Sequence, residues 1–446
     1  MQCNQEKTIN LLLLPFYNLV RKAVFFVHQS KMFPIDHALR SYIRQNFDIF
    51  LVYFSLGFLL QLPVTVMRFF FVDELHFRSA DLAQAAAVVG FPWAVKPLTA
   101  FLSDNFFRKC LRRSRQVSLG YGLSGLSWFA LFLFPRTTFL VLLCAFLSSY
   151  FMSLADVCQD GIMVRRINTD SSNANGRLQS FVLATRAFGS LLGSFFSGAL
   201  ALVGEPFLII GLLHLIGIWS GWKLQERRGD GRVHKSTCVH SCSALTSAML
   251  WPERLLFIGT LFLLAMPLSD FAIMQYWFQK TKHVSTFSFA MADAVAYIAT
   301  ITSSLFFNMK LRNRDWRVVV MLTQCILFVF LACNILLLNN YLNWNPTVYF
   351  FIRAGIGSFF GHLGFMPLAV KSADLVADGM ESTFYSLYMS TMNFGSVCSE
   401  ELSGLTTKVI GVDASTDRSV FFYMVVIASN LVSLLVFHIV YSKSER

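Results

Sequence analysis

Apolar segments about twenty residues long recur through this chain of 446 residues. Hydrophobic residues make up 55% of the sequence and charged residues only 14%, whereas a soluble domain carries roughly 25% charge. Because so few side chains are charged, the chain cannot cover itself with a water-compatible surface, and its solvent must be the bilayer. Every backbone polar group then needs an internal partner, which segments of this length achieve as spanning helices rather than barrel strands.

The hydropathy pattern predicts an all-α polytopic membrane protein with about twelve spanning helices. The first six are expected near residues 48–72, 82–103, 117–134, 138–162, 178–203 and 206–223. The second six are expected near residues 252–277, 286–308, 317–338, 346–370, 383–408 and 419–441.

The longest polar stretch between expected spans is 224–250, which falls between the sixth and the seventh. We therefore expect two six-helix lobes joined by a cytoplasmic linker. The predicted parts are an N-terminal cytoplasmic segment 1–46, lobes 47–223 and 251–441, the linker 224–250 and a cytoplasmic tail 442–446.

One sequence pattern recurs at long range. Residues 188–198 read FGSLLGSFFSG, and residues 394–404, which lie 206 positions later, read FGSVCSEELSG. Parallel repeats of this kind are typical of two-lobed transporters that bind their substrate between the lobes. A chance match is the alternative, since Gly and Ser are common in membrane helices.

The formal net charge of +12 is compatible with a nucleic-acid partner, but the positions of the basic residues favour another explanation. Lys and Arg cluster in alternate connections, around residues 108–115, 165–177, 223–235 and 310–317. This is the positive-inside pattern, and it predicts that both termini lie in the cytoplasm. The positive charge is therefore explained by the orientation of the protein in the membrane, and we expect no nucleic-acid partner. Residues 9–28 are apolar only in patches and are expected to be interfacial or disordered.

His234, Cys238, His240 and Cys242 form a local cluster whose residue types could bind zinc. Their spacing matches no established zinc finger, so we predict neither a metal nor a cofactor. Intramembrane acyl or glycosyl transferases need a paired catalytic His or acidic motif, and the histidines here form no such pairing. The sequence therefore favours a non-enzyme: a transporter, or a receptor or scaffold that kept the transporter fold without transport.

Ionisable residues at membrane depth cost free energy and are functional candidates for that reason. Asp156 and Asp160 are one helical turn apart, so both carboxylates share a helix face. Arg186 opens a stripe of small and polar residues in the fifth span. The other candidates within spans are Lys96, Asp270, Asp293 and Arg353.

Structural roles compete with these functional ones. Arg68 lies near a span end, where a long side chain reaches the membrane interface, and we expect it to do so. Asp104 with Arg112 and Arg113 is expected to form a latch that gates the cytoplasmic end, and a substrate contact is the alternative. Arg186 and one of the two aspartates could instead form a buried ion pair that holds the fourth and fifth spans together.

Four strings in order resemble motifs of the folate–biopterin transporter family within the major facilitator superfamily. They are PWAVKPLTAFLSD at 92–104, DVCQDGIMV at 156–164, GRLQSFVLATRAFGSLLGSFFSG at 176–198 and GMESTFYSLYMSTMNFGSVCS at 379–399, which contains Asn393. The resemblance implies the twelve-helix facilitator fold and transport of pterins, folates or related metabolites. Departures from the family pattern occur at Ala100, Cys110, Leu111, Arg165, Arg166, Glu400 and Glu401.

Folate has a flat pterin ring and an anionic glutamate tail. Substrate binding is predicted to involve cations that can meet its carboxylates, together with the motif amide: Lys96, Arg186, Arg353 and Asn393. A desolvated carboxyl holds its proton more firmly, so Asp156 or Asp160 is predicted to couple proton uptake to rocking of the lobes. The expected partners are the bilayer, protons and a folate- or pterin-like molecule, in the plasma membrane rather than an internal one. A nucleoside-like or amino-acid-derived cofactor is the alternative cargo.

Overall fold

The computed structural model describes residues 37–103, 110–169, 177–225, 251–338, 345–375, 381–412 and 416–442. These residues are helical with short connections, and no strand occurs among them, so the all-α prediction is confirmed for this part of the chain. The chain divides into two compact units, Met1–Phe47 and Asp48–Arg446. The described part of the first unit contains α2 (His37–Gln45). The segment 9–28, Asp104 and the His/Cys cluster at 234–242 lie outside the described residues.

The helices before the central linker follow the expected spans closely. Together we call them the first half. Their bounds are α3 (Phe47–Phe69), continued by η1 (Phe70–Glu74), then α4 (Ser79–Ala94), α5 (Lys96–Leu102), α7 (Arg113–Leu133), α8 (Thr138–Thr169), α9 (Arg177–Leu200) and α10 (Pro206–Lys223).

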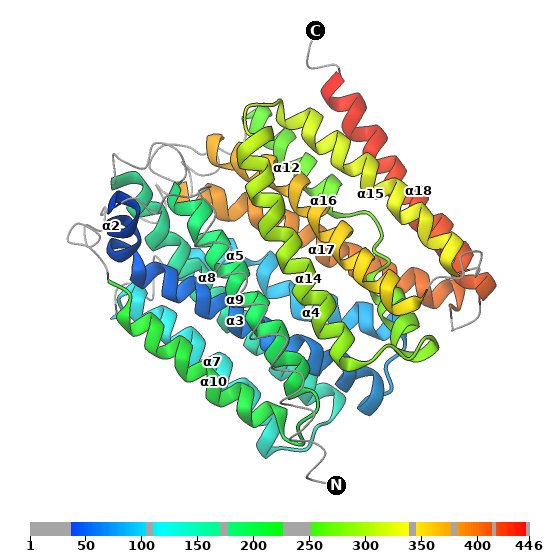
Figure 1. The fold of residues 1–446 in the computed structure, drawn as a ribbon, viewed down its shortest axis with the longest axis horizontal. Helices are drawn as coiled ribbons and strands as arrows, with labels where there is room; N and C mark the ends of the chain where they lie inside the picture. Colours follow the sequence, from blue (N-terminus) through cyan, green and yellow to red (C-terminus); the bar gives the residue numbers. More distant parts are fainter. Residues whose placement is uncertain are drawn as a thin grey trace. The chain divides into compact units, whose positions relative to one another are not determined.

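The helices after the linker form the second half. Their bounds are α12 (Pro252–Ala265), α13 (Phe271–Tyr276), η4 (Trp277–Thr281), α14 (Thr286–Phe306), η5 (Phe307–Leu311), α15 (Trp316–Leu338), α16 (Pro346–Asp374), α17 (Glu381–Ile410) and α18 (Thr416–Ser442). Figure 1 shows neighbouring pairs within each half, such as α7 beside α10 and α15 beside α18, which also pack together.

The second predicted span is divided into α4 and α5, and the break falls at Val95. Pro97 has no N–H, so the carbonyl of Trp93, four residues earlier, loses its normal helical partner. The side-chain amide of Asn393 on α17 donates to this carbonyl at 3.1 Å. A side chain from the second half therefore satisfies a backbone group that proline leaves free in the first half.

The seventh predicted span, 252–277, is not one continuous helix as expected, because α12 ends at Ala265 and α13 begins at Phe271. Pro267 disfavours helical conformation before it and leaves the Leu263 carbonyl without a helical donor. Ser433 on α18 donates to that carbonyl at 2.7 Å. Within the break, Leu268 N donates to Ser429 Oγ at 3.1 Å, and Ser269 N donates to a hydroxyl of α17. Such partners allow non-helical backbone at membrane depth.

The matched strings on α9 and α17 make equivalent packing contacts. A Cβ added to Gly198 would clash with Ala290 of α14, and one added to Gly404 would lie 3.0 Å from the Ala80 oxygen of α4. The offset of 206 residues places α4 over α14 and α9 over α17, and the halves meet along α4 with α17 and α9 with α14. The repeated glycines therefore allow equivalent close helix contacts at the two seams between the halves.

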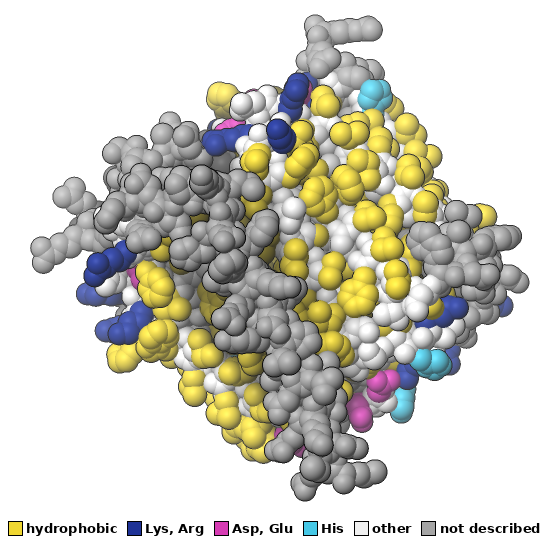
Figure 2. Space-filling model, viewed as in Figure 1, with side chains coloured by type: hydrophobic (Ala, Val, Ile, Leu, Met, Phe, Trp, Pro, Cys, Tyr) yellow, Lys and Arg dark blue, Asp and Glu magenta, His cyan; other side chains and the backbone are white. Residues whose placement is uncertain are grey.

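Many large hydrophobic side chains are exposed on the described helices, as contact with a bilayer requires. Figure 2 shows hydrophobic side chains over the middle of one face and charged side chains mainly towards its edges. Among the described residues, seven helices are long and apolar enough to cross a membrane. The interrupted α4–α5 and α12–α13 spans are not among these seven, because each is divided at its proline.

Candidate functional site

A cavity of about 330 Å³ lies between the two halves, and we call it the inter-half cavity. Helices α3, α4, α5, α7, α8 and α9 line it from one side, and α16 and α17 from the other. The sequence-predicted residues that it brings together are Lys96, Arg113, Asp156, Asp160, Arg186 and Asn393.

Asp156 is the centre of the charged cluster in this cavity. Its carboxylate is fully buried and accepts from Lys96 Nζ on one oxygen and from Arg186 Nη1, at 3.2 Å, on the other. The break before α5 brings Lys96 to this position, and α9 supplies Arg186. One carboxylate is thus shared by two cations, so neither cation is fully neutralised by a partner of its own.

Trp93 gives the cluster an aromatic face. Its ring centroid lies 4.3 Å from Lys96 Nζ and 5.8 Å from the Arg186 guanidinium carbon. The indole N–H donates to Ser149 Oγ at 3.0 Å, and that hydroxyl donates to the Val89 carbonyl at 2.6 Å. These bonds fix the orientation of the ring, so it forms a rigid surface beside the cations.

Arg186 fits both of its predicted alternatives geometrically. It forms the expected ion pair between α8 and α9 through Asp156, yet its side chain remains 30% exposed and lines the cavity. A partly exposed guanidinium has further N–H groups, and it can donate them to another carboxylate while it keeps its pairing with Asp156.

Asp160 lies one turn beyond Asp156 on α8, as the spacing predicts, and also lines the cavity. The Tyr53 hydroxyl of α3 donates to its Oδ1 atom. Tyr53 was not among the predicted site residues, because a tyrosine within an apolar span carries no local signal of its partner. The two carboxylates therefore have different environments: Asp156 forms ion pairs with two cations, whereas Asp160 accepts a hydrogen bond from a neutral hydroxyl.

The predicted gating residues separate in the structure. Arg113 is buried, lines the inter-half cavity and packs against Gly161, where an added Cβ would lie 2.6 Å from Nη1. Arg112 is exposed. Because Asp104 lies outside the described residues, the gating role of the three residues stays a prediction.

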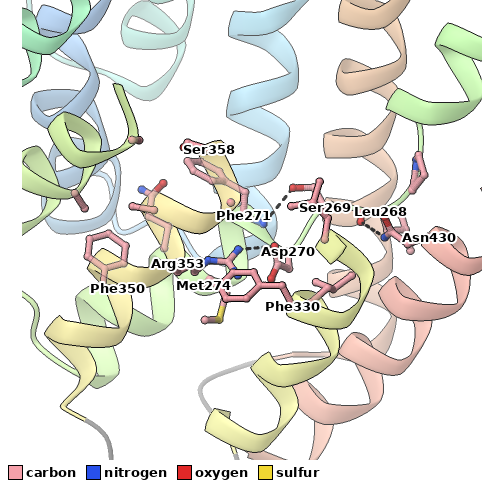
Figure 3. Close-up of a pocket in the computed structure, with 18 of the residues that line it drawn as sticks. Leu268, Ser269, Asp270, Phe271, Met274, Phe330, Phe350, Arg353, Ser358 and Asn430 are labelled. Carbon is pink, nitrogen blue, oxygen red and sulfur yellow. Dashed lines mark hydrogen bonds and ion pairs between the residues drawn. The ribbon is translucent and has the colours of Figure 1, made fainter. Parts of the chain in front are cut away.

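Arg353, predicted to act with Lys96 and Arg186, lies in a different cavity of about 480 Å³ (Figure 3). Residues of the second half line it together with Arg68 of α3, and we call it the second-half cavity. Its guanidinium donates to Asp270 at 2.6 Å. Asn334 and Tyr423 each donate to the other carboxylate oxygen of Asp270 at 2.9 Å. The structure therefore divides the predicted cations between two sites.

Arg68 does not reach the membrane interface as expected. Its side chain is only 16% exposed, and Nη1 lies 2.7 Å from Asp293 Oδ2 on α14. Gln61 of α3 donates to the same oxygen at 3.1 Å. The expectation was wrong because a carboxylate from the other half, 225 positions away, lies within reach of the guanidinium.

Sequence comparisons identify relatives along nearly the whole chain. Residues 56–442 match the BT1 family. The chain is 25% identical to Folate transporter 1 of Plasmodium falciparum (isolate 3D7), over 84% of this chain and 75% of that protein. It is 24% identical to the Folate-biopterin transporter of Synechocystis sp. (strain ATCC 27184 / PCC 6803 / Kazusa), over 86% of this chain and 78% of that protein.

Among solved structures, the nucleoside transporter NupG is similar with a TM-score of 0.67 at 12% identity, over 89% of this chain and 98% of that one. At this identity the likeness concerns the fold alone. It agrees with the paired seams α4–α17 and α9–α14, and the architecture is the two-lobed major facilitator fold. The helices and this fold are those of a multi-pass membrane protein, the relatives are transporters, and the chain belongs to the BT1 family.

Proposed function

We propose that this transporter moves folate, a pterin or a related metabolite across the plasma membrane by alternating access, coupled to protons. The observation that carries the proposal is the shared ion pair in the inter-half cavity, where Asp156 faces both Lys96 and Arg186. The names of the relatives, folate and folate-biopterin transporters, support the substrate class.

The cavity offers what an anionic, flat molecule needs. A substrate carboxylate replaces part of the Asp156 contact to Arg186, which is exposed enough to receive it. Trp93 provides a ring surface against which a pterin or aminobenzoyl group stacks. Three cations and two carboxylates line the cavity, so the balance of charge favours an anion: Lys96, Arg113 and Arg186 against Asp156 and Asp160.

Proton coupling follows from the two carboxylates on α8. When substrate engages Arg186, Asp156 loses part of its cationic neighbourhood while Asp160 remains one turn away. Two charged carboxylates at that spacing repel each other, and uptake of a proton by either one relieves the repulsion. Rocking of residues 47–223 against residues 251–441 then exposes the cavity alternately to the two sides.

The test is uptake of labelled folate by liposomes containing the purified chain, with and without an imposed pH gradient. Wild type is expected to accumulate folate with the gradient, Arg186→Ala to lose uptake at least about tenfold, and Asp160→Asn to lose the response to the gradient. Arg136→Ala is the matched control, because Arg136 pairs with Glu205 away from the cavity.

Normal folate uptake by both cavity variants would show that these roles are wrong. Absence of flux for folate, biopterin and a nucleoside panel would favour a receptor or scaffold instead. Microscopy of a fluorescently tagged chain checks the proposed plasma-membrane location, which an internal-membrane signal would contradict.

A further inference from the structure

The second-half cavity is built differently from the inter-half cavity. Its walls carry two cations and two carboxylates, so its formal charge is balanced. Figure 3 shows Arg353 reaching Asp270, with Phe350, Met274 and Phe330 around the pair. The phenylalanines that line the cavity are Phe271, Phe289, Phe328, Phe330 and Phe350. A neutral, planar molecule fits these walls better than an anion.

The break between α12 and α13 forms one edge of this cavity, since Pro267, Leu268, Ser269 and Asp270 line it. Interrupted spans of transporters typically form substrate sites, because the unwound backbone lines a cavity instead of facing lipid. Here the partners of the broken backbone come from α17 and α18, which hold the break open as a fixed part of the wall.

Asp293 supplies an available acceptor. Arg68 and Gln61 both donate hydrogen bonds to its Oδ2 atom. Within the described ranges no hydrogen bond reaches Oδ1. The side chain is 18% exposed and lines the cavity, so a ligand there can approach the carboxylate. Asp270 differs, because both of its oxygens already accept hydrogen bonds from the protein.

We propose that the second-half cavity is a separate binding site for a neutral planar heterocycle whose adjacent N–H groups donate hydrogen bonds to the Asp293 carboxylate. The 2-amino-4-oxo edge of a pterin presents two parallel N–H groups in the fork geometry that suits a carboxylate. The inference rests on the proposed function for its choice of pterin, and it gives free, uncharged pterins a binding site separate from the inter-half cavity.

Binding at Asp293 also acts on the contact between the halves. Arg68 belongs to the first half and Asp293 to the second, so their ion pair joins the two. A ligand that engages both carboxylate oxygens competes with Arg68 for Oδ2. Occupancy of the cavity therefore weakens this contact, and removal of Arg68 does not weaken ligand binding.

The experiment measures binding of biopterin to the purified full chain in nanodiscs, with p-aminobenzoyl-glutamate as the anionic comparison. Asp293→Asn is expected to weaken biopterin binding about tenfold or more, whereas Arg68→Gln leaves it unchanged or tightens it. Ala296→Phe, which fills the cavity from α14 and leaves the ion pair intact, is expected to abolish it. Binding of p-aminobenzoyl-glutamate is expected to be unaffected by all three.

Asp73→Asn is the matched control, since it removes another ion pair between the halves, Asp73 with Lys280, outside the cavity. Its biopterin affinity is expected to equal that of wild type. Equal weakening by Asp293→Asn and Arg68→Gln would overturn the proposal, because a purely structural contact gives that result. Wild-type affinity in Asp293→Asn or in Ala296→Phe would overturn it too, as would failure of wild type to bind biopterin.

Folate uptake measured in parallel separates this inference from the proposed function. If uptake occurs while the second-half cavity fails its test, the proposed function stands and the second site is wrong. If biopterin binds as expected and no folate is taken up, the second site stands and folate transport is wrong.

Discussion

One proline-interrupted span occurs in each half of the described chain, and the two breaks have different partners. At the first, Pro97 frees the Trp93 carbonyl, which Asn393 of the opposite half binds. At the second, Pro267 frees the Leu263 carbonyl, which Ser433 of the same half binds. The first break is therefore bonded across the contact between the halves, while the second is bonded within its own half.

The buried charges beside the two breaks differ in the same way. Lys96 at the first break shares Asp156 with Arg186, so the carboxylate retains a cation if either is removed. Asp270 at the second break is the carboxylate that Arg353 meets in the described structure. The charge beside the first break is therefore replaceable and lies between the halves, whereas the charge beside the second is less replaceable and lies within one half.

The largest expected effect comes from removing the charge at each break. Asp270→Asn leaves the Arg353 guanidinium without its carboxylate and should lower the free energy of unfolding by about 3–5 kcal/mol. Lys96→Met should cost clearly less, because Arg186 still pairs with Asp156. Thermal unfolding of the purified variants, followed by intrinsic fluorescence, measures the difference.

The double variant Asp270→Asn/Arg353→Met provides the control for that prediction, since it removes the uncompensated cation and should recover part of the lost stability. An equal loss for Lys96→Met and Asp270→Asn would contradict the asymmetry between the breaks.

Close packing, unlike the charges, should respond alike in the two halves. A Cβ at Gly189 would overlap the Phe54 carbonyl oxygen, and one at Gly395 would lie 2.7 Å from the Ala265 Cβ. Gly189→Ala and Gly395→Ala should each cost about 1–3 kcal/mol of folding free energy. Gly357→Ala is the matched control, because nothing lies within 4 Å of its added Cβ.

The melting temperatures of these three variants test whether the two close-packed glycines contribute equally to stability. Should Gly189→Ala and Gly395→Ala prove as stable as Gly357→Ala, the repeated glycines would not set the distance between the helices.

The smallest effects should come from the two side chains that bind the freed carbonyls. Asn393→Ala and Ser433→Ala each remove one hydrogen bond, worth about 0.5–1.5 kcal/mol. Both should lower stability slightly, but only Asn393→Ala should also change the rate of folate uptake, because its bond crosses between the halves. Parallel measurements of melting temperature and liposome uptake test this. Altered uptake in Ser433→Ala would contradict the expectation that only the bond between the halves affects transport.

Hydropathy predicts most helix bounds well because the bilayer fixes span length, and α10 and α16 begin where expected. It does not detect the break at Pro267, since hydropathy averages over a window and proline is tolerated when neighbouring side chains replace the lost bonds. The hydroxyl groups that do so lie on α17 and α18, far away in the sequence.

Part of the site was predictable because its signals lie within single predicted helices. Asp156 and Asp160 share a helix face by spacing alone, and Arg186 stands out as a charge at membrane depth. The pairing of Arg68 with Asp293 could not be predicted, because it joins residues 225 positions apart. The separation of Arg353 from the inter-half cavity likewise depends on how α16 packs, which no local pattern encodes.

A structure determined by electron cryo-microscopy with folate at saturating concentration tests the central claim most directly. The account predicts folate density in the inter-half cavity, with a carboxylate beside Arg186 and an aromatic group against Trp93. Folate bound elsewhere, with the inter-half cavity empty and Arg186 still paired only with Asp156, would contradict it.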